Sequence, residues 1–213
     1  MRQLFKLLAL FLFALAVLTV CSKSQLKPNN DIRIVKYPLD NSNGILTFAL
    51  ADGFYIAFDT VQCGLYKVWR GGLAANDSTI TAVGDLYYEN YLLNSDIKLI
   101  DTSGQGYSPV VKFKGFKLSD NTIKLFYQVT DEDIEFTLEE SIDGESEKSA
   151  YNLHRNYISN NLPDNTRIGI YIPNSSIRKP LTIDAIKGEV ASGIDKLLLP
   201  QKGKSKFILS FSE

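Results

Sequence analysis

The sequence is poor in the residues that build metal centres and disulfide frameworks. Its 213 residues include one His, one Trp and two Cys. A histidine-based metal site needs several imidazole or thiolate ligands, and a disulfide framework needs several cysteine pairs. Neither kind of structure is expected here.

An excess of charge of one sign is also missing. The chain carries 23 Lys and Arg against 24 Asp and Glu, a formal net charge of −1. Nucleic-acid-binding proteins display a basic face and a high isoelectric point. We therefore expect no nucleic-acid partner.

Motifs of common catalytic and cofactor sites are absent as well. The chain has no CxxC, CxxCH, HExxH, GxSxG or P-loop pattern and no dinucleotide-binding GxGxxG. Without CxxCH there is no covalent c-type haem, and a catalytic thiolate at Cys63 would need a basic neighbour and a positioned His. We expect a protein with no catalytic residues, cofactor or metal, in which Cys63 is a buried thiol.

The N-terminus has the pattern of an export signal. Arg2 and Lys6 form a short basic region before an apolar or small run of 14 residues, Leu7 to Val20. This run is shorter than the roughly 20 residues that span a bilayer and matches the central region of a signal peptide. The sequence LTVC, followed by the polar SKSQ, resembles a bacterial lipobox, which implies lipidation of Cys21. A plain signal peptide with an incidental cysteine, or an uncleaved anchor, are the alternatives.

These features predict three parts. Residues 1–20 are a signal peptide, residues 21–30 a lipidated tether, and residues 31–213 a single folded domain. The protein is then exported and held by its lipid on the periplasmic side or at the outer membrane, with its folded part in water.

From residue 31 onward, apolar and polar residues alternate with a period of two. Strand-length runs recur about every ten residues, between turn signals such as Asp52-Gly53. This pattern predicts an all-β fold, an antiparallel β-sandwich. One or two short helices are expected at Gly64–Trp69 and Leu86–Leu93.

The middle of the chain gives more local predictions. Residues 110–118, 123–129 and 134–138 are expected to form a three-stranded meander, with a bulge at Gly115. Residues 143–149 are expected to be an exposed loop, and His154 a hydrogen-bonded residue of the strand that follows.

The most distinctive segment is IAFDTVQCGLYKVWRGGL, residues 56–73. It contains the one Trp, a Cys and a Gly-Gly pair, which favours a tight corner with Trp69 in the core. The alternative interpretation is a ligand-binding surface on which a sugar stacks. Its candidate residues are Trp69, Arg70, Tyr87, Tyr88 and Tyr91.

This segment, together with VKFKGFKL and IKLFYQV further along, resembles a β-rich module that accompanies c-type cytochrome domains. Such modules occur in exported bacterial proteins of the sugar or sorbosone dehydrogenase type. The resemblance covers roughly residues 45–140. It implies a shared fold and a c-type cytochrome or dehydrogenase as partner, with the haem in another domain or protein.

The strand rhythm is also similar to the super-sandwich of aldose epimerases. Those enzymes use two histidines, whereas this chain has His154 alone, so epimerase activity is not expected. Three functions remain open: an accessory module of a periplasmic redox system, a carbohydrate-binding or carbohydrate-processing domain, and a structural envelope lipoprotein.

Overall fold

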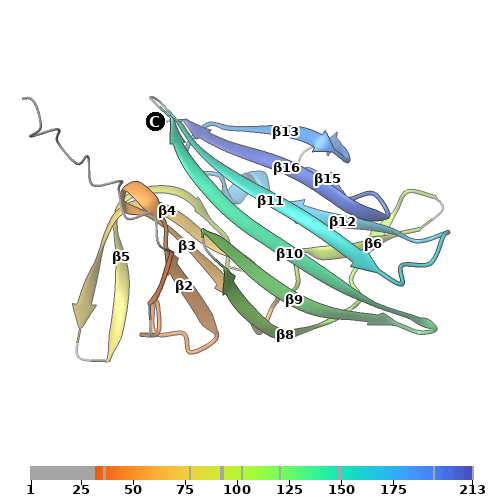
Figure 1. The fold of residues 1–213 in the computed structure, drawn as a ribbon, viewed down its shortest axis with the longest axis horizontal. Helices are drawn as coiled ribbons and strands as arrows, with labels where there is room; N and C mark the ends of the chain where they lie inside the picture. The colour runs from red at the N-terminus through yellow and green to blue at the C-terminus, as the bar shows by residue number, and fades with distance from the viewer. Residues whose placement is uncertain are drawn as a thin grey trace, which may run out of the picture.

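The computed structural model describes residues 32–35, 37–76, 78–91, 94–101, 103–119, 121–147, 150–193 and 195–212. The predicted signal peptide and Cys21 lie outside these ranges. Within them the chain forms three antiparallel sheets, joined by short connections that include two 3-10 turns, η1 (Ala51–Gly53) and η2 (Asn174–Ser176) (Figure 1). The predicted all-β sandwich is confirmed.

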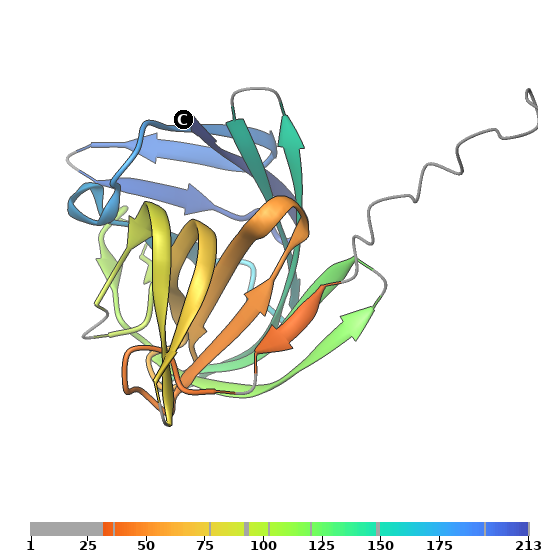
Figure 2. The same ribbon diagram turned by 90° about the vertical axis from the view of Figure 1, so that its left-hand side faces the viewer.

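The first sheet, sheet A, is a five-stranded meander in chain order. Its strands are β1 (Arg33–Val35), β2 (Ile45–Ala49), β3 (Phe54–Asp59), β4 (Gly64–Asn76) and β5 (Thr79–Glu89). The predicted turn at Asp52-Gly53 is confirmed, because both residues have the positive φ angles, 57° and 72°, of a tight reversal. Figure 2 shows this sheet in front of the other two.

The short helices expected at Gly64–Trp69 and Leu86–Leu93 are wrong. Residues 64–69 belong to β4 and residues 86–89 to β5, and the two strands pair directly, with Trp69 opposite Leu86. All six residues of β4 from Gly64 to Trp69 are buried. A strand that is covered on both faces loses its polar–apolar alternation, so its period cannot be read from the sequence.

The second sheet, sheet C, has six strands in the order β13-β16-β11-β10-β9-β8. The bounds are β8 (Val110–Ser119), β9 (Thr122–Asp131), β10 (Ile134–Glu147), β11 (Ala150–Asn160), β13 (Leu181–Lys187) and β16 (Gly203–Ser212). The predicted meander is confirmed, and so is the bulge, because the register between β8 and β9 shifts at Gly115.

The exposed loop expected at residues 143–149 is wrong. Strand β10 runs on to Glu147 and pairs with β11, with Asp143 opposite His154. Gly144 lies beside the ring of Tyr151, where a Cβ atom would collide with that ring. The Asp-Gly pair therefore marks a close contact with Tyr151 and not a turn.

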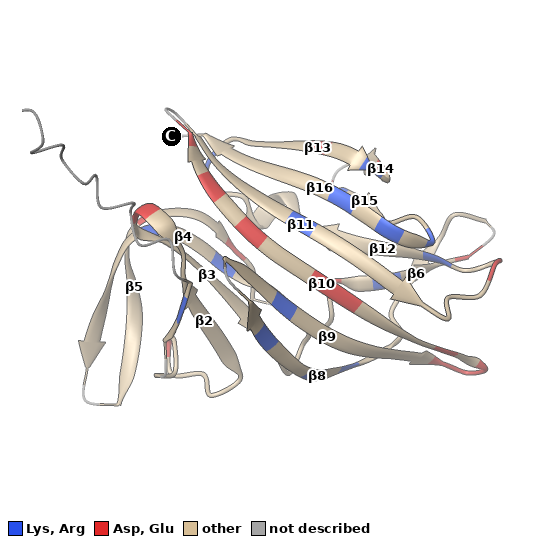
Figure 3. Cartoon of the chain, in the orientation of Figure 1, with Lys and Arg blue, Asp and Glu red and all other residues tan. Residues whose placement is uncertain are grey.

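The outer face of sheet C is charged. In Figure 3, β10 carries bands of acidic residues, and the neighbouring β8 and β9 carry basic ones. Lys124 of β9 lies 2.6 Å from Glu139 of β10 across the strands. Partly exposed pairs of this kind contribute little to stability but keep this face soluble.

The third sheet, sheet B, has the order β14-β15-β12-β6-β7. Its strands are β6 (Ile97–Ile100), β7 (Gly106–Tyr107), β12 (Arg167–Ile172), β14 (Glu189–Ser192) and β15 (Lys196–Leu199). Strand β12 is central, and its Ile168, Ile170 and Ile172 are at most 1% exposed. The alternate residues, Gly169 and Tyr171, therefore lie on the outer face of this sheet.

One apolar core joins the three sheets, and a smaller one covers the other face of sheet A. In the large core, the rings of Phe54 in β3 and Tyr151 in β11 stack with centroids 3.6 Å apart. The small core contains Trp69, which is 1% exposed, stacks on Tyr55 and donates its Nε1–H to the carbonyl of Gly72 at 3.0 Å. The core interpretation of Trp69 is confirmed.

Replacing Trp69 with Ala should lower the free energy of unfolding by about 3–5 kcal/mol, because it leaves a large hole in the small core. Urea denaturation followed by far-UV circular dichroism measures this change without relying on tryptophan fluorescence. Tyr91→Ala is the control, since Tyr91 is 67% exposed and its loss should shift stability by less than about 1 kcal/mol. Equal effects of the two substitutions would contradict the core role.

Candidate functional site

The five residues of the expected sugar-stacking surface do not come together. Trp69 lies in the small core on one face of sheet A, whereas Tyr87 and Tyr88 lie in the large core on the other face. All three are 1% exposed, so their rings are unavailable to a ligand. Arg70 packs its guanidinium 5.5 Å from the Phe54 ring. Of the five, Tyr91 alone is strongly exposed, and it borders a cavity described below.

The other singled-out residues have structural surroundings. Cys63 is 1% exposed, and burial, reinforced by Asp96 and Asp59, raises the pKa of its thiol to about 11 against the effect of a backbone hydrogen bond. The predicted buried thiol is confirmed. His154 lies in β11 with its Nδ1 2.6 Å from Asp143 Oδ1, as expected for a hydrogen-bonded strand residue.

A cluster of buried charges lies inside sheet C. Arg155 of β11 donates its Nε–H to Glu140 of β10 at 2.5 Å. The hydroxyl groups of Tyr127 and Tyr157 donate to the same carboxylate at 3.4 and 3.1 Å. The side chains of Arg155 and Glu140 are 1% and 3% exposed, so this pair exchanges no hydrogen bonds with bulk water and depends on its partners.

Asp96, immediately before β6, connects this cluster to the other sheets. Its carboxylate accepts the backbone N–H of Leu65 in β4 at 3.2 Å and lies 3.8 Å from Nη2 of Arg155 in β11. Its backbone carbonyl accepts the N–H of Tyr171 in β12 at 2.8 Å. One residue therefore touches sheets A, B and C.

The environment of Asp96 favours its protonated form. Burial raises the pKa of this carboxyl to about 7, and Glu140 adds to the rise, while Arg155, the Leu65 N–H and Lys98 oppose it. The same burial would lower the pKa of Arg155, but Glu140, Tyr157 and Asp96 hold that pKa well above its usual value. The cluster thus contains a permanent cation and a carboxyl that titrates near neutrality.

Two cavities lie beside Tyr171 of β12. The first, the Asp96 cavity, has a volume of about 240 Å³, and its walls include Tyr91, Asn94, Asp96, Lys98 and Tyr171. The second, the Lys196 cavity, has a volume of about 230 Å³. Its walls include Lys98, Ile100, Tyr171, Asp195, Lys196 and Leu197. Because they share Lys98 and Tyr171, the two cavities adjoin.

Gly169 shapes the floor of the Lys196 cavity. It is paired with Lys98 on β6, and a Cβ atom there would lie 2.8 Å from a Leu197 methyl and 3.1 Å from an Ile100 methyl. These two apolar side chains therefore lie over the glycine and form a hydrocarbon floor between the polar walls.

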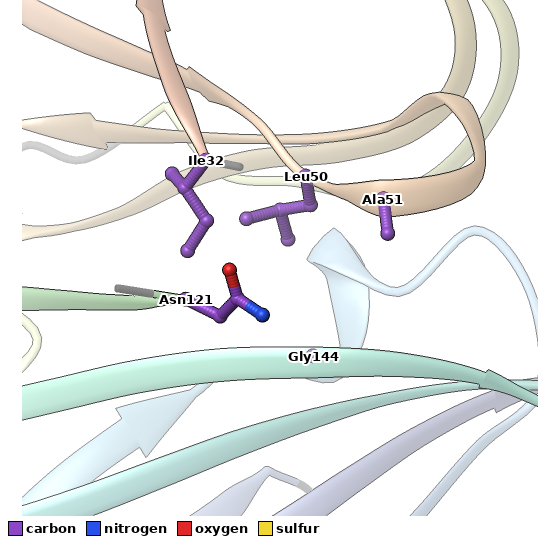
Figure 4. Close-up of a pocket in the computed structure, with 5 residues that line it drawn as sticks. All are labelled: Ile32, Leu50, Ala51, Asn121 and Gly144. Carbon is purple, nitrogen blue, oxygen red and sulfur yellow. The ribbon is translucent and has the colours of Figure 1, made fainter. Parts of the chain in front are cut away.

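A third cavity is too small for an organic ligand. It lies between Leu50 and Ala51 of sheet A and Gly144 of β10, with Ile32 and Asn121 at its sides (Figure 4). Its volume of about 30 Å³ matches the space of one water molecule. A further cavity of about 200 Å³ is lined by Tyr37, Ala75, Asn76 and Thr79 and has no charged side chain among these residues. The pair of cavities at Tyr171, which combines aromatic, amide and charged groups, is therefore the candidate functional site.

No protein-family model, no curated protein and no solved structure matches this chain. The resemblance to cytochrome-associated modules stays a prediction. Within the described part of the chain, no group of His, Cys, Asp and Glu side chains is arranged to hold a metal ion. In the same ranges, no helix is long and apolar enough to cross a membrane.

The titration of Asp96 should make stability depend on pH. Its folded-state pKa of about 7 exceeds the ordinary value near 4, so the folded state retains a proton that the unfolded state releases. The contribution of protonated Asp96 to the free energy of unfolding is fully present below about pH 4 and is lost as the pH rises through 7. Between pH 4.5 and 7.5 the free energy of unfolding should fall by about 3 kcal/mol relative to Asp96→Asn.

Urea denaturation of both proteins at the two pH values measures the difference. Asp85→Asn is the matched control, because the side chain of Asp85 is 68% exposed, and it should keep the pH dependence of the unmodified protein. If Asp96→Asn has the same pH dependence as the unmodified protein, Asp96 is ionised in the folded state and the assignment is wrong.

Proposed function

We propose that this protein is a non-catalytic binding module for a carbohydrate, with its site at the two cavities that share Tyr171. The observation that carries the proposal is this pair of adjoining cavities, which places aromatic, amide, carboxyl and ammonium groups around one space. Ligand sites characteristically combine apolar walls with a few polar groups that fix the orientation of the ligand.

The chemistry of the walls suits a sugar. A sugar ring has C–H faces that pack on aromatic rings and hydroxyl groups that both donate and accept hydrogen bonds. Tyr171 and Tyr91 supply rings, Asn94 supplies an amide with both donors and acceptors, and Lys98 supplies an ammonium group. This replaces the stacking surface predicted around Trp69 with one built on a different tyrosine.

The carboxylates support binding better than hydrolysis. Glycoside hydrolysis needs two carboxyl groups facing each other across the scissile bond. In this site, Asp195 is occupied by the Tyr171 hydroxyl and by the N–H of Asn174 at 2.8 Å, which makes it a group that positions Tyr171. Glu140, the carboxylate of the buried ion pair with Arg155, accepts hydrogen bonds from Arg155, Tyr127 and Tyr157.

Tyr171→Ala should weaken or abolish sugar binding, because it removes the wall common to both cavities. Tyr171→Phe keeps the ring and should retain most of the affinity. Tyr37→Ala is the control, because Tyr37 is 59% exposed and lines the separate cavity beside Ala75 and Thr79; it should leave binding unchanged. Isothermal titration calorimetry of full-length protein against the best hit of a glycan array gives the measurement; an array without hits among neutral and acidic sugars would refute the proposal.

A second proposal concerns the cellular location and the partner of this module. It rests on the sequence resemblance over residues 45–140. The protein is exported, anchored through a lipid on Cys21, and serves as an accessory to a periplasmic dehydrogenase or c-type cytochrome. In support, two residues of that resemblance, Trp69 and Cys63, are buried, as expected when a shared pattern reflects a shared fold. A structural envelope lipoprotein is the remaining alternative.

Gentle detergent solubilisation followed by affinity purification tests the redox setting. We expect a haem-containing or dehydrogenase partner in the eluate, visible by its absorption spectrum, and fatty-acid labelling that disappears in Cys21→Ala. Recovery of the protein alone as a stable monomer would count against an accessory role.

A further inference from the structure

Two lysines face each other on the outer surface of sheet C. Lys187 of β13 lies directly opposite Lys206 of β16. Lys204 lies two residues before Lys206, and the alternate residues, Ser205 and Phe207, are fully buried, so both lysines of β16 point outward. These three lysines form the lysine patch, and Figure 3 shows the basic bands on β16.

The lysine patch has no acidic partner. Among the residues that the structure describes, none of its three ammonium groups forms an ion pair with a carboxylate. The residue opposite Lys206 on its other side, in β11, is the neutral Asn156. Like charges directly opposite each other on antiparallel strands repel, so this arrangement costs stability.

Acids close to the patch along the chain are paired with other cations. Asp164, in the turn after β11, contacts Lys202. Glu189, two residues after Lys187, contacts Arg167 at 3.1 Å. The surroundings of the patch therefore supply little negative charge to offset its three ammonium groups.

Elsewhere on the same face, facing lysines are neutralised. Lys117 of β8 lies opposite Lys124 of β9, but Lys124 contacts Glu139 of β10 at 2.6 Å. Sheet C thus places a carboxylate beside one pair of facing lysines and leaves the other pair without one. At the lysine patch, an anion from outside the protein would relieve the repulsion by binding between the ammonium groups.

The layout of the patch suits an extended acidic polymer better than one small anion. Lys204 and Lys206 lie about 7 Å apart along their strand, and facing residues lie about 5 Å apart across strands. Successive acid groups of a polymer can therefore meet successive lysines. Asn156 supplies an amide beside them, and Ile158 and Ile208, half-buried on the same face, supply apolar surface for sugar rings.

Other polyanions fit this face less well. Acidic residues follow β10 across the same sheet (Figure 3), and they would repel the wide phosphate surface of a nucleic acid or an anionic membrane. Ile186, beside Lys187, is 63% exposed, but membrane-binding surfaces bury a broad apolar face. A narrow polymer that crosses β13 and β16 avoids the acids of β10.

We propose that the lysine patch is a second ligand-binding surface, which takes an acidic polysaccharide with its carboxylate groups between Lys187, Lys204 and Lys206. The cavities at Tyr171 belong to sheet B. This surface is therefore separate from the carbohydrate site proposed above and goes beyond it.

Isothermal titration calorimetry of full-length protein tests the inference with an oligogalacturonate and a neutral glucose oligomer of the same length. We expect the acidic probe to bind about tenfold more tightly than the neutral one. Its affinity should fall between about 50 and about 300 mM NaCl, because salt screens exposed charges. Tyr171→Ala should leave this salt-dependent binding unchanged.

Lys187→Gln, Lys204→Gln and Lys206→Gln should each weaken binding of the oligogalacturonate about threefold, and the triple variant about 30-fold. Lys206→Arg keeps the charge and should retain the affinity. Lys117→Gln is the matched control, because Lys117 also faces a lysine on this side of sheet C, and it should leave the affinity unchanged. The urea midpoint should not fall in any of the glutamine variants of the patch, since each removes a repelling charge.

The outcomes separate this surface from the cavity site. Equal affinity for the acidic and neutral probes, or an unchanged affinity in the triple lysine variant, would overturn the inference. Binding of phosphatidylglycerol vesicles that is lost in the triple variant, without binding of oligogalacturonate, would also overturn it and assign the patch to a membrane. Lysine-dependent binding of oligogalacturonate, with no effect of Tyr171→Ala on any sugar, would support the patch and overturn the cavity site alone.

Discussion

The arrangement of the three sheets depends on a buried ionic contact centred on Asp96, Arg155 and Glu140. Removing charged groups from water is expensive, and a buried pair is tolerated only when its geometry and its hydrogen bonds are good. Glu140 meets this condition through Arg155 and two tyrosine hydroxyls. The Nη1 atom of Arg155, by contrast, is buried with no hydrogen-bond partner, so the cluster keeps an unsatisfied donor. Asp96 makes its three contacts, to Leu65, Arg155 and Tyr171, where sheets A, C and B meet.

The candidate site grows out of this junction. The carbonyl of Asp96 fixes the N–H of Tyr171, and Asp195 holds the hydroxyl of the same tyrosine, so the ring is fixed at both ends. A ring held in this way loses little conformational entropy on binding, which improves affinity without any additional contact.

Most of the fold could be predicted from the sequence, because alternation and turn residues act locally. The meander of residues 110–138, the bulge at Gly115 and the turn at Asp52-Gly53 follow from neighbouring residues. The predictions for residues 64–69 and 143–149 were wrong because both segments are shaped by tertiary contacts. Residues 64–69 are buried on both faces, and Tyr151 packs over Gly144. Apart from Tyr91, which lines the Asp96 cavity, the candidate site escaped prediction for the same reason. One signal was present, since Arg155 shares the face of Tyr151, Leu153 and Tyr157, which places a charge among apolar residues. Nothing local linked it to Asp96 or to Tyr171.

Strand β12 contributes residues both to the core and to the candidate site, and substitutions at these two kinds of position have different effects. Along this strand, Ile168, Ile170 and Ile172 face the core, whereas Tyr171 lines both cavities and Gly169 lies beneath Leu197 and Ile100. A substitution at Tyr171 changes the walls of both cavities while the core packing stays intact, so the cavities can change among descendants that keep the same thermodynamic stability. A lineage of such proteins would then diverge fastest on the outer surface of sheet B, and its members would share a scaffold while differing at these cavities.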